Sequence, residues 1–112
     1  MNMATSNSAV TPQDVDALIA RSDSPVLIDC FTPGCGPCAA LSPVLDDLAA
    51  EMGDRLAIEK IDVAAYPEVA SRFGVRGVPT LLLFKKGQLC ASRTGAASRM
   101  QLLTWLSVQE AV

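Results

Sequence analysis

Apolar residues recur along the chain with two spacings, which predict alternating helices and strands. Val15, Leu18 and Ile19 follow one another at the three- and four-residue spacing of a helix face. The residues before them fit a helix start, because Thr11 can cap the first turn and Pro12 suits the first helical position. We therefore predict a first helix here, ending at about residue 21.

Uninterrupted apolar segments predict the strands. Residues 26–31 and 80–84 are almost entirely apolar, which is typical of strands covered on both faces of a sheet. Residues 56–62 alternate less regularly but also favour a strand, and the turn after residue 84 predicts a hairpin with residues 89–93. Asp29 is the one charged residue in the first of these strands, and its position there requires an explanation.

Three further helices are predicted between and after these strands. One helical pattern covers residues 38–52, a shorter one covers residues 68–73, and Ser98 with Gln101 has the spacing of a capping box that opens the last helix. Residues 1–8 are expected to be flexible or to form a short edge strand. Helices between the early strands imply parallel pairing and the hairpin adds antiparallel strands, so the predicted fold class is α/β with a mixed sheet.

The length and composition fit one domain and narrow the class of partner. Of the 112 residues, half are hydrophobic and 19% are charged, which is typical of a globular chain with a single core. The net charge is −3 with no basic stripe, so neither a nucleic acid nor an anionic membrane is an expected partner. The N-terminus does not resemble a secretory signal and no apolar run is long enough to span a membrane, so a cytoplasmic location with reduced thiols is expected.

The cysteines carry the candidate chemistry, because the chain has no histidine for a catalytic pair or a zinc site. Cys35-Gly36-Pro37-Cys38 follows a predicted strand and opens a predicted helix, whose N-terminus favours a thiolate on Cys35. Cys38 lies about one turn further on, where it can attack a disulfide formed at Cys35. The alternative is a structural zinc site, but only Cys30 and Cys90 could complete it and they form no second close pair. No metal is therefore expected.

From about residue 11 to residue 106, the chain resembles the thioredoxin family. The matching segments are Val26-Leu27-Ile28-Asp29, Cys35-Gly36-Pro37-Cys38 and Phe73-Gly74-Val75-Arg76-Gly77-Val78-Pro79-Thr80-Leu81-Leu82-Leu83-Phe84-Lys85-Lys86-Gly87. The resemblance implies a thioredoxin fold, with a mixed sheet of four to five strands flanked by about four helices and a single domain over residues 1–112. It also implies a protein-disulfide reductase that forms its mixed disulfide at Cys35. Such a protein has no bound cofactor, acts as a monomer and is re-reduced from NADPH by a thioredoxin reductase.

The resemblance also assigns roles to residues outside the cysteine motif. Asp29 matches the family's buried acid, which exchanges a proton with Cys38, and desolvation is expected to raise the pKa of Asp29. Lys60 matches the lysine that moderates the charge of that acid. Pro79 matches the family's cis-proline, beside which the backbone of Val78 would pair with an extended substrate. The residues expected to bind substrate are Gly34, Gly36, Pro37, Val78, Pro79 and Gly95.

Three positions depart from the family pattern. Gly34 and Phe31 stand where the family usually has tryptophan, and Ala39 stands where it usually has lysine. These changes leave the exchange chemistry intact but alter the docking face, so a binding module dedicated to one partner is a second hypothesis. Cys30 is expected to be a small buried hydrophobic residue, and Cys90 has the alternatives of a structural or an exposed regulatory thiol.

Overall fold

A four-stranded sheet in the order β2-β1-β3-β4 is the centre of the computed structural model, which describes residues 10–112. Its strands are β1 (Val26–Phe31), β2 (Ala57–Asp62), β3 (Thr80–Lys85) and β4 (Gln88–Thr94). β1 pairs with β2 in parallel, while the β1–β3 and β3–β4 pairs are antiparallel. This sheet confirms the predicted mixed pairing, and the edge strand considered for residues 1–8 lies outside the described residues.

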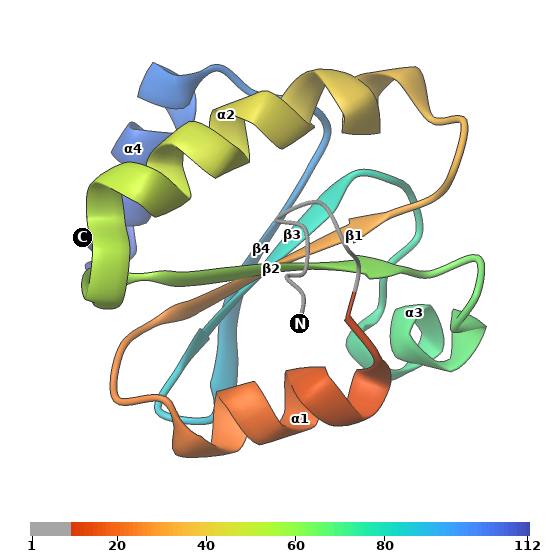
Figure 1. The fold of residues 1–112 in the computed structure, drawn as a ribbon, viewed down its shortest axis with the longest axis horizontal. Helices are drawn as coiled ribbons and strands as arrows, with labels where there is room; N and C mark the ends of the chain where they lie inside the picture. The colour runs from red at the N-terminus through yellow and green to blue at the C-terminus, as the bar shows by residue number, and fades with distance from the viewer. Residues whose placement is uncertain (1–9) are drawn as a thin grey trace.

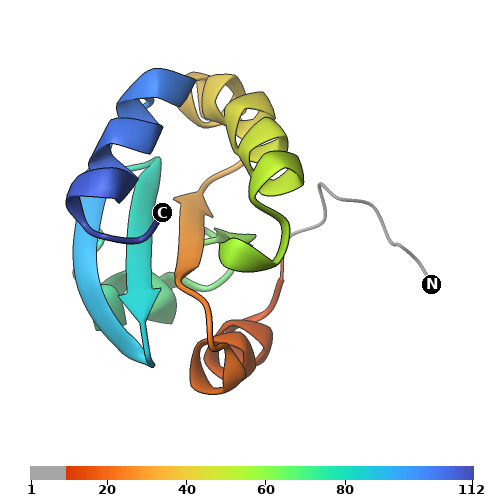
Figure 2. The same cartoon turned by 90° about the vertical axis from the view of Figure 1, so that its left-hand side faces the viewer.

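Helices cover both faces of the sheet, as Figures 1 and 2 show. The longest, α2 (Gly36–Met52), lies with α4 (Arg99–Val108) on one face, while α1 (Pro12–Arg21) and α3 (Pro67–Phe73) lie on the other. A short 3-10 helix, Gly53–Arg55, follows α2. The predicted α/β architecture with about four helices is therefore confirmed.

The two central strands are apolar because each of their faces meets a separate core. Leu27 packs in one cluster with Leu45 of α2 and Leu106 of α4. Ile28 packs in the other cluster, which also contains Val15 of α1. Because successive strand residues point to opposite faces, Asp29 points to the same face as Leu27, toward α2.

Local capping signals fix where three of the helices begin. Thr11 and Ser98 are N-caps whose side chains accept the backbone N–H three residues on, so both helix starts match the sequence prediction. The long helix, however, begins at Gly36 rather than at residue 38. The physical reason is that Cys35 is itself the N-cap, with its sulfur accepting the N–H of Cys38.

No helix over residues 10–112 is long and apolar enough to cross a membrane.

Candidate active site

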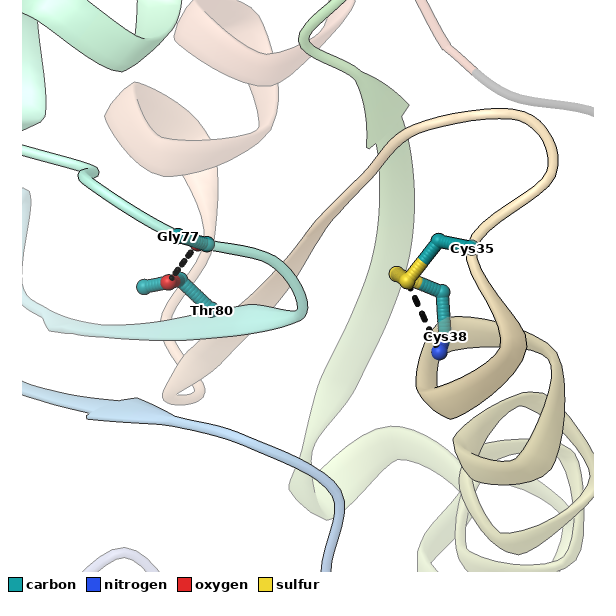
Figure 3. The surroundings of a disulfide bond; sticks show 4 residues. All are labelled: Cys35, Cys38, Gly77 and Thr80. Carbon is teal, nitrogen blue, oxygen red and sulfur yellow. Dashed lines mark hydrogen bonds between the residues drawn. A yellow bond between two sulfur atoms is a disulfide. The ribbon is translucent and has the colours of Figure 1, made fainter.

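A disulfide joins Cys35 and Cys38 at the N-terminus of α2 (Figure 3). Their Cα atoms are 5.2 Å apart, and the N–H of Cys38 donates to the sulfur of Cys35 at 3.1 Å. Cys35 is half-buried, whereas Cys38 is 6% exposed. A partner molecule therefore reaches Cys35 more readily, and the N–H groups of the helix start favour negative charge on its sulfur.

The loop before the disulfide depends on a glycine conformation. Gly34 has a φ of +79°, in the region that side chains with a Cβ rarely adopt. A Cβ at this position would meet no atom within 4 Å, so the space beside the disulfide is open. Gly36 and Pro37 then start the helix, where the missing N–H of Pro37 costs no helical hydrogen bond.

Asp29 lies beneath the cysteines as a buried acid. It is 1% exposed, and within residues 10–112 its Oδ1 atom has no hydrogen-bond partner. Burial raises the pKa of the carboxyl from 3.8 to about 6, although the positive charge of Lys60 acts in the opposite direction. The predicted direction of the pKa shift, and its cause, are therefore confirmed.

Lys60 is brought next to Asp29 by the parallel pairing of β1 and β2, in which the two residues are direct partners. The lysine is 8% exposed, and its Nζ donates to Ser42 Oγ at 2.5 Å and to Asp46 Oδ1 at 2.9 Å. Sequence reasoning placed Lys60 near the acid but missed these two partners. The signal that could have found them is the four-residue spacing of Cys38, Ser42 and Asp46, which places all three on one side of α2.

A cavity of about 190 Å³ connects these groups. It is lined by the buried acid, the two cysteines, the lysine and the residues around the loop: Asp29, Phe31, Thr32, Gly34, Cys35, Cys38, Ala39, Ser42 and Lys60. The three positions that depart from the family pattern all line this cavity, where Gly34 and Ala39 are exposed and Phe31 is half-buried. The volume is sufficient to hold water beside the cysteine sulfurs and the carboxyl.

A second loop lies at the same end of the sheet as the disulfide. The Val78–Pro79 peptide bond is cis, as predicted, and the N–H of Gly95 donates to the Pro79 carbonyl at 2.8 Å. The register pairs Cys30 with Thr80, so the start of β3 adjoins the end of β1 that leads to the cysteine loop. In Figure 3, this loop is recognised by Thr80, whose hydroxyl donates to the Gly77 carbonyl.

The other two cysteines lie away from this site. Cys30 is fully buried on the opposite face of β1, and burial together with the negative charge of Asp29 raises the pKa of its thiol to about 12. It is a small buried hydrophobic residue, as predicted. Cys90 is exposed on β4, where its sulfur donates to the Leu83 carbonyl at 3.4 Å. Over residues 10–112, no group of three or more acidic or cysteine side chains could hold a metal ion.

The chain is similar in sequence to known proteins over most of its length. A family model described as Thioredoxin matches residues 6–108. A thioredoxin of Haemophilus influenzae is 39% identical over 98 residues, which cover 88% of this chain and 92% of that protein. A thioredoxin of Rhodospirillum rubrum is 38% identical over 88 residues, covering 79% and 85% of the two chains. A thioredoxin of Acidithiobacillus ferridurans is 38% identical over 100 residues, covering 89% and 93%.

Proposed function

The chain belongs to the thioredoxin family and is a thiol–disulfide oxidoreductase, and from this premise we propose that it reduces protein disulfides with Cys35 as the attacking thiol. The observation that carries this proposal is the Cys35–Cys38 disulfide at the start of α2, above the buried Asp29. Cys35 is the more accessible of the two sulfurs and accepts a helix N–H, while Cys38 is enclosed beside the acid.

The reaction proceeds in two exchanges that start from the dithiol. In the first, the Cys35 thiolate attacks one sulfur of the substrate disulfide, so that a mixed disulfide forms and the other substrate sulfur leaves as a thiolate and takes up a proton. In the second, Cys38 gives its proton to the Asp29 carboxylate and attacks the Cys35 sulfur. The mixed disulfide breaks, the second substrate sulfur leaves as a thiolate that takes up the proton held by Asp29, and the Cys35–Cys38 bond remains. The substrate has gained two electrons from the two cysteines, one proton from solvent and one proton from Cys38 by way of Asp29.

The acid is suited to this proton transfer. A pKa of about 6 leaves Asp29 mostly ionised at neutral pH, yet basic enough to accept a proton from a thiol. Asp29 and Cys38 line the same cavity, which provides a path for the proton. Lys60 lowers the pKa of Asp29, which is the moderating effect expected from the resemblance.

The loop at Pro79 is the proposed substrate groove. An extended segment of the substrate would pair with the backbone of Val78, which puts its disulfide next to Cys35. Gly95 supports this loop through its bond to Pro79, and the remaining members of the site are Gly34, Gly36 and Pro37 in the cysteine loop. None of these positions carries a charge. We therefore propose that the groove binds extended substrate segments with little dependence on the amino-acid sequence of the substrate.

We further propose that residues 1–112 form one domain that works as a cytoplasmic monomer and is re-reduced from NADPH by a thioredoxin reductase. The family membership and the redox-active cysteine pair support this cycle. Loss of NADPH absorbance with a bacterial thioredoxin reductase and insulin as the final acceptor would measure it. A chain that dithiothreitol reduces but no such reductase does would contradict the recycling step.

Acceleration of insulin reduction by dithiothreitol tests the central proposal. The wild type and a control, Cys90→Ser, are expected to accelerate the reaction, while Cys35→Ser and Cys38→Ser are not. Cys38→Ser is expected to accumulate a mixed disulfide with substrate that mass spectrometry detects, because nothing resolves it. Stable adducts through Cys38 in Cys35→Ser would reverse the two roles, and an inactive wild type would favour a dedicated binding module.

A further inference from the structure

One side of α2 carries a thiol, a hydroxyl and a carboxylate at successive four-residue steps. These groups belong to Cys38, Ser42 and Asp46, and they face the two paired strands that carry Asp29 and Lys60. Cys38, Ser42, Asp29 and Lys60 line the same cavity. Cys38 of α2 therefore shares the cavity with the buried Asp29, while Ser42 and Asp46 accept hydrogen bonds from Lys60.

The ammonium of Lys60 hydrogen-bonds α2 rather than the acid. Two of its three donors are directed to Ser42 and Asp46, at 2.5 Å and 2.9 Å. The side chain of Asp46 is 41% exposed, so this anion draws the ammonium toward the edge of the site. Meanwhile Asp29 Oδ1 is buried with no hydrogen-bond partner in the part of the chain that the structure describes.

The place of this one cation matters because few other charges face the acid. On α2 the other titratable groups near Asp29 are the two cysteines, which are bonded together in the oxidised protein. On β3 the partner of Asp29 is the apolar Leu81. Cys30 of β1 and Glu59 of β2 are next in sequence to Asp29 and Lys60 and therefore point to the opposite face of the sheet. Asp62 of β2 lies on the same face as Lys60, but its Oδ1 accepts the N–H groups of Ala64 and Ala65 beyond the strand. Burial is the largest cause of the raised pKa of Asp29, and the positive charge of Lys60 opposes it.

We propose that Ser42 and Asp46 are positioning residues that hold the Lys60 ammonium on the α2 side of the cavity, and that they thereby set the pH range in which Asp29 can take a proton from Cys38. The inference deepens the proposed function and rests on it for the role of the proton transfer. Its physical basis is that an ammonium bound directly to the acid would stabilise the carboxylate and make it a weaker base. By holding the lysine, α2 keeps the pKa of Asp29 high enough for the carboxylate to accept the proton of Cys38.

Titration of the Asp29 carboxyl in the oxidised protein tests this inference without any catalytic turnover. Carboxyl carbon NMR of the wild type is compared with Ser42→Ala, in which the freed donor of Lys60 turns to the unpartnered Oδ1 of Asp29. At an effective dielectric constant of about 20, a cation that moves from about 6 Å to about 4 Å of a carboxylate lowers its pKa by about one unit. We expect a downward shift of the Asp29 midpoint of about half a unit or more, with Ser42→Thr retaining the wild-type value because it keeps the hydroxyl.

A double-mutant cycle separates positioning from a general structural effect. In a Lys60→Gln background, Ser42→Ala is expected to cause no further shift, because the group it holds is gone. Asp46 itself is half-exposed. With Lys60 present, Asp46→Asn is expected to lower the Asp29 midpoint at least as much as Ser42→Ala does, because it releases the ammonium and removes an anion.

Either of two results would overturn the inference: an unchanged or raised midpoint in Ser42→Ala, or the same shift with and without Lys60. Failure of the proposed function would instead appear as an inactive wild type in the insulin assay while these titrations still behave as expected.

Discussion

Replacing Asp29 with asparagine is expected to stabilise the oxidised protein at neutral pH. Asp29 is 1% exposed, and burial raises the pKa of its carboxyl from 3.8 to about 6 against the opposing charge of Lys60. In the unfolded chain the carboxyl ionises at its ordinary value. Folding at neutral pH therefore brings an anion into a site that disfavours it, and the substitution removes that cost.

The magnitude follows from the difference between the two pKa values. A shift from 3.8 to about 6 corresponds to about 3 kcal/mol, at about 1.36 kcal/mol for each pKa unit. Because the folded-state pKa is raised, the destabilisation is absent below about pH 3.8, grows as the pH rises between the two values, and is complete above about pH 6. The asparagine amide gains no better partners than the carboxyl had, which offsets about 1–2 kcal/mol of the benefit. We expect a net gain of about 1–2 kcal/mol at about pH 7.5 and near equality with the wild type at about pH 4.5.

Denaturant unfolding of the oxidised proteins at these two pH values measures the effect, with Asp47→Asn as an exposed control on α2. The free energy of unfolding of Asp29→Asn relative to the wild type is expected to rise by about 2 kcal/mol between about pH 4.5 and pH 7.5. The control is expected to stay within about 0.5 kcal/mol of the wild type at both. A stability difference for Asp29→Asn that does not widen with pH would refute the reasoning, because it would mean that the buried carboxyl titrates as it does in the unfolded chain.

Three further predictions follow from the same geometry. Insulin reduction by the wild type is expected to slow as the pH falls through about 6, where Asp29 becomes protonated and can no longer accept the proton of Cys38; a profile unchanged in Asp29→Asn would contradict this role. Gly34→Ala is expected to lower the free energy of unfolding by about 1 kcal/mol because of the positive φ at this position, although its Cβ meets no neighbour; thermal or denaturant unfolding checks it. Trp105 lines a groove with Arg93 and Met100 and packs on the α2–α4 core, so its fluorescence emission is expected to change little when the disulfide is reduced; a large rise would place it near the cysteines.

The sequence determined the elements whose signals are local. The caps at Thr11 and Ser98 marked the starts of α1 and α4, because capping is satisfied within one turn of chain. The apolar run of β1 predicted a strand covered on both faces, and the strand is buried as expected. The spacing of Cys35 and Cys38 predicted two thiols within bonding reach at a helix start, and the structure has them bonded there, with Cys35 as the N-cap of α2. The resemblance added the cis bond at Pro79, which no local pattern required.

Only the tertiary structure decided how these elements meet at the site. The sequence placed Asp29 in a buried strand, but the pKa of the acid depends on the depth of burial and on where the charge of Lys60 lies. That charge is held by Ser42 and Asp46, which lie 18 and 14 residues away in sequence. Their four-residue spacing puts both on one side of α2, but only the packing of α2 against β2 brings them to Lys60. The physical reason is the same in each case. Capping and periodicity act between neighbours along the chain, whereas the electrostatics of a buried acid sum over groups that the fold alone brings together.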